Sequence, residues 1–206
     1  MKSKEEDVLS VFYNHPTKHW HFNQLVKEIG IADSKLDSWL KKFILLGLVE
    51  RIKIKGEMPF YISNFKHPEY QNRKRIYALQ VLHEIGFLNH IVSLQGVKTA
   101  IVFGSFARWD WHWKSDLDLF LFGNSDEFEI SRYEKVLKRE IQVFEYKNLQ
   151  ELRKLHEDLM KNIIKGYVIK GNVDFLKVSI NENKPNSKRS PKGLPRRRHS
   201  NAKNRS

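Results

Sequence analysis

TAIVFGSFARWDWHWKSDLDLFLF, residues 99–122, contains two apolar runs separated by a polar and aromatic segment. The first run, residues 100–103, is predicted to be a buried strand that ends at Gly104, because it is short, continuous and followed by a turn-forming residue. The second run, residues 119–122, has the same character and ends at Gly123-Asn124. The stretch therefore predicts two buried strands that hold the residues between them in place.

Two aspartates, Asp116 and Asp118, open the second run. Because side chains alternate along a strand, both carboxylates are expected on the same face, where they repel each other unless a cation lies between them. Mg²⁺ prefers a few carboxylates together with phosphates and water. Gly104 allows close approach of the backbone, and Ser105 offers a hydroxyl and a backbone N–H to a phosphate. The residues alone therefore predict a site for a metal ion and a nucleotide.

The spacing of these residues resembles a family signature. Gly104-Ser105, ten intervening residues and Asp116-x-Asp118 are similar to the motif of nucleotidyltransferases related to DNA polymerase β, in particular the small "minimal" members. Ala107-Arg108 also fits the family's usual Gly-Ser-x-Ala-Arg-Gly, whereas Trp109 stands where the family has glycine. The resemblance covers residues 97–178 and implies an α/β (α+β) domain with a small mixed sheet.

The resemblance also implies the roles of individual residues. In the family the Gly-Ser loop holds the triphosphate, the aspartates bind divalent metal, and a third carboxylate lies on a neighbouring strand. Residues 139–146 are predicted to form that strand, and they carry Glu140 and Glu145 on opposite faces. Glu145 shares its face with Ile141 and Val143, which is the more apolar face, so Glu140 is preferred as the third metal ligand and as the residue that helps deprotonate the acceptor.

Two further residues, Arg108 and Ser115, are candidates for contact with the nucleotide. The alternative for Arg108 is a surface position without a ligand, and the alternative for Ser115 is that it caps the strand. The tryptophans of residues 109–113 are expected either to stack on a base or to pack against the body of the protein. The activity implied by the resemblance is Mg²⁺- or Mn²⁺-dependent transfer of a nucleoside monophosphate from an NTP, with ATP as first choice. The acceptor hydroxyl would belong to a partner protein, an RNA or a small molecule.

Residues 1–65 are predicted to form a separate module. Apolar spacing predicts helices over 5–13, 22–29 and 34–46, and a hairpin follows over 48–62. This order and the phrase LLGLVERIKIKG, residues 45–56, resemble the winged helix-turn-helix family, which implies that the third helix enters the major groove of DNA. Protein contact is the alternative use of such a module. The residues expected to bind nucleic acid on the third helix are Lys35, Ser38, Lys41 and Lys42.

The remaining segments divide at residues 66–96, 97–178 and 179–206. The first is predicted to be a helical linker that breaks or kinks at Gly86, and the second, the nucleotidyltransferase domain, is expected to include helices over 126–137 and 149–164 and a last short element over 172–178. The third is a tail with almost no apolar residues, predicted to be disordered. Its expected contacts with a phosphate backbone are Arg196, Arg197 and Arg198.

Composition narrows the classes of function. The formal net charge is +13, mostly from the tail, and the absence of cysteine excludes disulfides, thiolate zinc sites and cysteine nucleophiles. Neither a signal peptide nor an apolar run of membrane-spanning length is visible, so we expect a cytoplasmic protein without a membrane partner. The competing hypothesis to an enzyme is a winged-helix, DNA-binding transcriptional regulator whose nucleotidyltransferase-like domain is non-catalytic.

Overall fold

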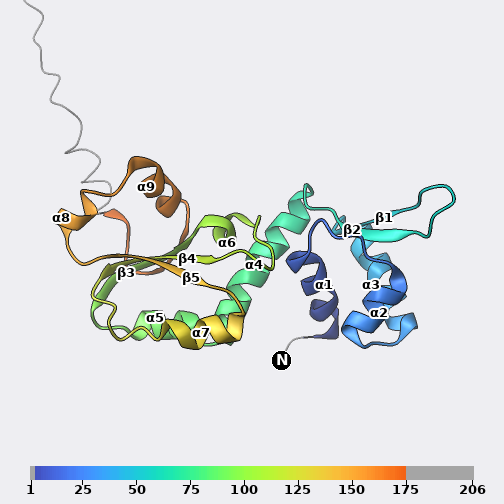
Figure 1. Cartoon of the computed structure of the whole chain (residues 1–206), viewed down its shortest axis with the longest axis horizontal. Coiled ribbons are helices and arrows are strands. Elements are labelled where there is room, and N and C mark those ends of the chain that lie inside the picture. Colours follow the sequence, from blue (N-terminus) through green and yellow to red (C-terminus); the bar gives the residue numbers. More distant parts are fainter. Residues whose placement is uncertain (1–2, 175–206) are drawn as a thin grey trace, which may run out of the picture.

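The computed structural model describes residues 3–174 and shows two parts joined by one long helix, α4 (Pro68–Glu84) (Figure 1). The N-terminal part is helical with one hairpin, and the C-terminal part is a sheet covered by helices. No helix among the described residues is long and apolar enough to cross a membrane. The predicted tail, with Arg196, Arg197 and Arg198, lies outside the described residues.

The N-terminal part has the order of elements that the sequence predicts. Helix α1 begins with a capping box, in which the Glu6 N–H donates to Ser3 Oγ at 3.2 Å and the Ser3 N–H donates to Glu6 Oε2 at 3.1 Å. Helix α2 ends at Gly30, which has φ +67°. Assignment to the winged-helix family stays a prediction. The elements are α1 (Lys4–Asn14), α2 (Phe22–Ile29), α3 (Asp33–Leu45), β1 (Val49–Ile52) and β2 (Phe60–Ser63).

The linker region forms two helices, of which α4 is the first and α5 (Phe87–Ser93) the second. Gly86 separates them with φ +77°, which is the break that the sequence predicts. Helix α4 is attached to the N-terminal part, because Tyr70 Oη donates to the Phe12 carbonyl at 3.1 Å in a buried position. The same helix contacts the C-terminal part through Ala78 and Leu82, which are buried.

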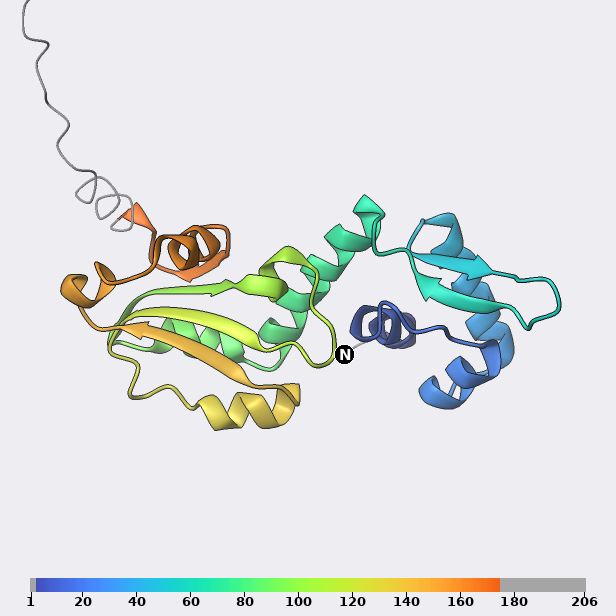
Figure 2. The ribbon, with the colours of Figure 1, turned by 45° about the horizontal axis from the view of Figure 1, so that its top comes forward.

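The C-terminal part is built on a four-stranded sheet with the order β5-β4-β3-β6. Strand β4 runs parallel to β5, whereas β3 is antiparallel to both β4 and β6, so the expected mixed sheet of an α+β domain is confirmed. Helices α5 and α7 lie on one face, and α8 and α9 lie on the other (Figures 1 and 2). The remaining bounds are β3 (Val97–Phe103), β4 (Leu117–Gly123), α7 (Ile130–Leu137), β5 (Ile141–Tyr146), α8 (Leu149–Leu152), α9 (Glu157–Ile164) and β6 (Tyr167–Lys170).

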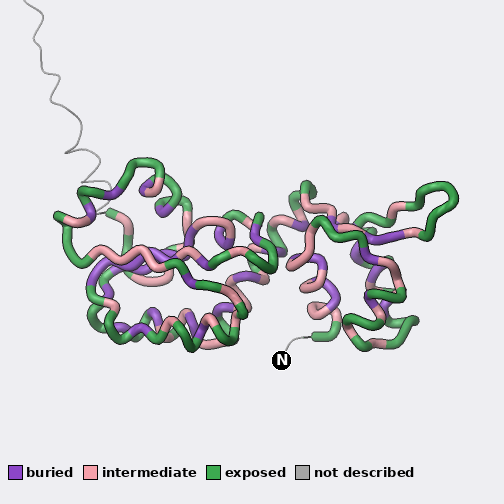
Figure 3. The backbone as a smooth tube through the Cα atoms, in the orientation of Figure 1, coloured by how far each residue is buried: buried purple, intermediate pink, exposed green. Residues whose placement is uncertain are grey.

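Strands β3 and β4 are buried on both faces, which explains why they read as continuous apolar runs (Figure 3). Leu119 and Leu121 pack on the side of α5 and α7, in a core that continues into the N-terminal part. Phe120 and Phe122 pack on the opposite side, against Leu152 and other residues of the α8–α9 segment. The site residues described below lie at the ends of these two strands.

Two local predictions differ from the structure, and one strand was not predicted. Residues 149–164 form two helices rather than one, because the His156 side chain accepts from the Asp158 N–H and starts α9 separately. Strand β6, at Tyr167–Lys170, was not predicted, whereas the short element expected over 172–178 lies mostly outside the described residues. Residues expected to form the Gly-Ser loop begin a five-residue helix, α6 (Gly104–Arg108).

Candidate active site

Gly104 lies against Asp118 where β3 ends and β4 begins. Phe103 and Asp118 are direct partners in the antiparallel β3–β4 pair, and Gly104 follows with φ +68°. A methyl group on the Cα of Gly104 would lie 1.8 Å from Asp118 Oδ2, so any side chain here would require the carboxylate or the backbone to move. The close approach expected of this glycine is therefore made to a carboxylate.

The two aspartates influence each other electrostatically. Burial, followed by the negative charge of Asp116, raises the pKa of Asp118, while Arg108 acts in the opposite direction. Asp116 is exposed and immediately precedes β4, and Asp118 is half-buried in its second position. A hard divalent cation between these carboxylates would relieve their repulsion, so the donor set fits such an ion.

Glu140 and Asp116 lie side by side, each immediately before the first residue of the β4–β5 strand pair. The Leu117 N–H donates to the Glu140 carbonyl at 2.9 Å, one position before the register of the parallel β4–β5 pair begins. The Glu140 side chain is exposed. Within residues 3–174, no three His, Cys, Asp or Glu side chains are grouped closely enough to hold a metal ion. The structure therefore does not bring Asp116, Asp118 and Glu140 together as a three-carboxylate group.

The residue directly beside Asp118 on β5 is Gln142, which the sequence analysis missed. Its side chain is exposed, and its amide oxygen is a neutral ligand of the kind that hard cations accept. Unlike a carboxylate, the amide of Gln142 cannot act as a general base. Only the register of two strands that are distant in sequence identifies Gln142, so no local signal could have found it.

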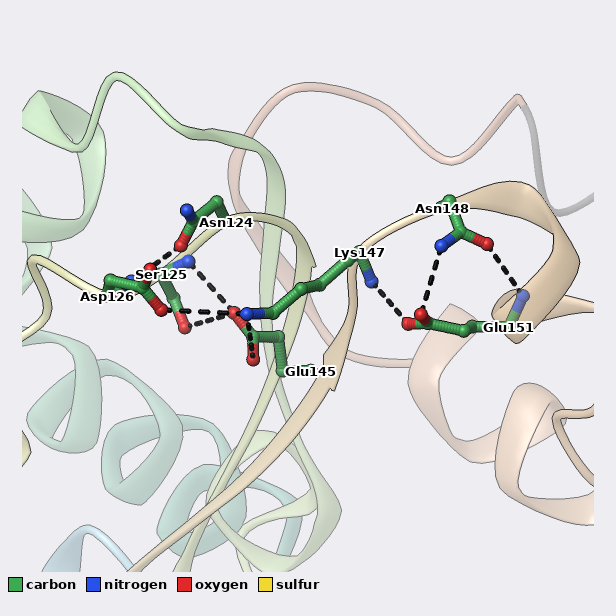
Figure 4. Close-up of polar contacts among 7 residues, drawn as sticks. All are labelled: Asn124, Ser125, Asp126, Glu145, Lys147, Asn148 and Glu151. Carbon is green, nitrogen blue, oxygen red and sulfur yellow. Dashed lines mark hydrogen bonds and ion pairs between the residues drawn. The ribbon is translucent and has the colours of Figure 1, made fainter.

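Glu145, the alternative third carboxylate, lies at the other end of β5 (Figure 4). It pairs with Leu121, three positions from the Asp118–Gln142 pair, or about 10 Å along the strand. Its Oε1 accepts from the Ser125 N–H at 2.9 Å and from Ser125 Oγ at 2.7 Å. Glu145 therefore has other partners and is remote from the aspartates.

The candidates for phosphate contact have different surroundings. Arg108 is about half exposed at the end of α6, and its Nη2 lies 3.2 Å from Asp110 Oδ2. The Ser115 hydroxyl accepts from the His112 N–H at 2.9 Å, so it stabilises the loop before Asp116. Ser105, in the first turn of α6, is half-buried next to Gly104.

The segment of residues 109–116, the active-site loop, begins with an unusual backbone conformation. Trp109 has φ +97°, and its N–H donates to the Ser105 carbonyl at 2.9 Å. Such a conformation suits glycine, which is the residue the family has here, and it strains a tryptophan. Trp111 is buried and stacks on Phe106 with a centroid distance of 5.2 Å, while Trp113 is 51% exposed. Trp111 therefore packs against the body of the protein and is not available to stack on a base.

The active-site loop is held by two basic side chains, the buried Lys74 and the half-buried Arg139. Lys74 Nζ donates to the Trp111 carbonyl at 2.5 Å, and burial lowers the pKa of Lys74 to about 7. Arg139 Nη1 donates to the carbonyls of His112, at 3.2 Å, and Ser115, at 2.7 Å. Neither residue was predicted to matter, because their partners are distant in sequence. They fix the path of the loop that leads to Asp116.

The predicted nucleic-acid residues of α3 are all exposed, but two of them are in ion pairs. Lys41 Nζ lies 2.7 Å from Asp37 Oδ2, and Lys42 Nζ lies 2.7 Å from Glu5 Oε1. Lys35 and Ser38 complete the set. The helix surface therefore carries less uncompensated positive charge than its lysines indicate.

Comparison with known proteins agrees with this geometry. Residues 85–186 match the model of a nucleotidyltransferase domain, and the match includes α6, Asp116 and Asp118. The chain thus carries a nucleotidyltransferase domain, which supports an enzyme of that class. A solved structure described as "Crystal structure of the toxin-antitoxin with AMP-PNP" is similar over 54% of this chain and 86% of that chain, with 15% sequence identity and a TM-score of 0.34. No curated protein matches the chain.

Proposed function

We propose that this protein transfers a nucleoside monophosphate from an NTP, with ATP as the preferred donor, to an acceptor hydroxyl and releases pyrophosphate. The observation that carries the proposal is the contact between Gly104 and Asp118, beside Asp116, within the segment that matches a nucleotidyltransferase domain. Ser105, whose hydroxyl and N–H are the proposed phosphate donors, directly follows Gly104 in the chain. A triphosphate needs hydrogen-bond donors for its oxygens and a metal ion, held by carboxylates, to neutralise its charge.

Asp116 and Asp118 would hold Mg²⁺ or Mn²⁺, and the raised pKa of Asp118 supports this, because burial and then the charge of Asp116 both disfavour its ionised form in the absence of a cation. When bound, the divalent ion supplies positive charge that stabilises the phosphate oxygens during transfer. Glu140, immediately before β5, and Gln142, on β5, are the neighbouring groups that can complete the site, one as a carboxylate and one as a neutral oxygen.

In the proposed reaction, the acceptor oxygen attacks the α-phosphorus. A new P–O bond forms as the bond between the α-phosphorus and the bridging oxygen of the β-phosphate breaks, and pyrophosphate leaves. Glu140 takes the proton of the acceptor hydroxyl, since it is an exposed carboxylate at the edge of the site. Gly104, Ser105 and Arg108 hold the β- and γ-phosphates.

The proposed acceptor is a protein or an RNA in the cytoplasm, and the N-terminal part is the proposed surface for positioning it. Exposed Lys35 and Ser38 support contact with DNA or RNA, whereas the ion pairs of Lys41 and Lys42 favour a protein partner. A pure DNA-binding regulator receives less support, because the Gly104–Asp118 contact serves no purpose in DNA binding.

The test is incorporation of label from each α-labelled NTP with Mg²⁺ or Mn²⁺, using bulk RNA and cell lysate as acceptors. The Asp116→Asn/Asp118→Asn variant is expected to lose incorporation. Asp126→Asn, an exposed aspartate near Lys147 at the far end of the sheet, is the matched control and is expected to keep it. Absence of both label transfer and pyrophosphate release in the wild type would reject the enzyme in favour of the regulator.

A further inference from the structure

A cavity of about 250 Å³ lies where α4, α6, α7 and the end of α1 meet. Its walls are mostly apolar, with Ala78 and Val81 from α4 and Val136 and Leu137 from α7. Val136 is 58% exposed, so the cavity is open to solvent along α7. Trp111 and Arg139 form its polar side together with Asn14 and Tyr77, and Arg139 also lies close enough to Asp116 to feel its charge.

Trp111 and Arg139 each bring a hydrogen-bond donor without an acceptor. Trp111 is 2% exposed, and its Nε1 has no hydrogen-bond partner among the described residues. The Nε of Arg139 is also buried without a partner in that part of the chain. Indole and guanidinium N–H groups can only donate, and a buried donor without a partner is costly. The cavity therefore offers two donors that no acceptor among the described residues satisfies.

The charge of Arg139 determines which kind of acceptor fits. Its guanidinium lies over the rings of Phe106, at 4.7 Å, and Trp111, at 5.6 Å, and burial lowers its pKa. Within residues 3–174 it makes no ion pair, its Nη1 donates to two backbone carbonyls, and the nearby charge of Asp116 acts on its pKa in the opposite direction to burial. A partly buried cation of this kind favours an anionic acceptor over a neutral one.

We propose that this cavity binds a small organic carboxylate with an apolar body. The carboxylate accepts hydrogen bonds from Trp111 Nε1–H and Arg139 Nε–H, and the apolar body packs between α4 and α7. The volume is below the range typical of drug-sized ligands, so a single-ring acid such as benzoate is an appropriate probe.

Occupancy of the cavity also has a consequence for the active site, and this consequence rests on the proposed function. Trp111 belongs to the active-site loop, and Arg139 holds that loop at Ser115, immediately before Asp116. A ligand that binds both would change the mobility of that loop and hence the rate of nucleotide transfer. Binding itself is measured without nucleotide, so its failure and the failure of the proposed function are separate results.

The experiment is a titration of the ¹⁵N-labelled full chain with benzoate, observed on the indole N–H resonances of its five tryptophans. The resonance that disappears in Trp111→Phe identifies Trp111. We expect a saturable shift of this resonance with a dissociation constant of about 1 mM, as suits a ligand of this size. Benzyl alcohol has nearly the same shape without the charge, and we expect it to bind at least about 10-fold more weakly.

Two variants test the assignment by calorimetry with benzoate. Trp111→Phe keeps an aromatic ring but removes the N–H, and it should weaken binding about 10-fold, whereas Trp113→Phe, in the same loop but outside the cavity, should leave binding unchanged. Ala78→Leu fills the cavity, keeps both donors and should abolish binding. The proposal is overturned by the absence of a saturable shift up to about 20 mM benzoate, by equal binding of benzyl alcohol, or by unchanged affinity in Trp111→Phe or Ala78→Leu.

Discussion

Replacing Gly104 by alanine tests the geometry on which the candidate site depends. The new methyl group would lie 1.8 Å from Asp118 Oδ2, whereas ordinary contacts begin at 3.4 Å. The carboxylate, or the start of α6, must therefore move by about 1.5 Å. The backbone contributes a second cost, because φ +68° disfavours alanine by about 1 kcal/mol.

These two costs predict different sizes of effect on folding and activity. The free energy of unfolding should fall by about 1–2 kcal/mol, since the half-buried Asp118 side chain can move toward solvent. Nucleotide transfer should fall about 100-fold, because a misplacement of about 1 Å in a reacting group has that effect. Urea denaturation measures the first quantity, and incorporation of labelled nucleotide at saturating NTP measures the second.

Gly30→Ala is the matched control for the backbone cost. Gly30 has φ +67°, nearly the same as Gly104, but no atom lies within 4 Å of the position that its Cβ would take. This variant should lose about 1 kcal/mol of stability and keep its activity. If Gly104→Ala retained more than about a third of the wild-type rate, or if Gly30→Ala lost as much activity, the reasoning from the Asp118 contact would be refuted.

Three further predictions concern residues around the same loop. Burial lowers the pKa of Lys74 to about 7, so the folded protein binds fewer protons than the unfolded chain above that pH, and stability should rise from pH 7 toward 10; Lys74→Met should remove this rise in urea midpoints measured across the range. Glu140→Gln should reduce label incorporation about 10-fold and Glu145→Gln should not, because Glu145 binds Ser125 instead; equal losses would contradict this assignment. Trp109→Gly removes the strain of φ +97° and should raise the unfolding free energy by about 1 kcal/mol, with a lowered urea midpoint as the opposing result.

The sequence predicted most of what depends on local pattern. The apolar runs that became β3 and β4, the break at Gly86 and the end of α2 at Gly30 follow from periodicity and glycine placement, and each is present in the structure. The split between α8 and α9 was missed because it depends on one side-chain cap, at His156. Apolar spacing continues across this break, so on its own it predicts a single helix.

The candidate site was predictable only in part, because several of its relations are long-range. The motif placed Gly104 and Asp118 in one site, but their direct contact follows from the β3–β4 register. Gln142 is beside Asp118 for the same kind of reason, since parallel register cannot be read from either strand alone. Lys74 and Arg139 act through backbone carbonyls distant in sequence, and carbonyls carry no sequence signal.

The attachment of α4 to both parts of the chain determines where the protein can be divided. Tyr70 and Lys74 lie one turn apart on α4, and the first bonds the N-terminal part while the second bonds the active-site loop. The main hydrophobic core extends from Val8 and Phe12 to Leu117 and Tyr133. A fragment beginning at residue 97 would lose Lys74 and uncover Trp111, so we expect the smallest fragment that folds with this loop intact to start no later than α4. Heating the whole chain should accordingly melt both parts in a single transition rather than one after the other.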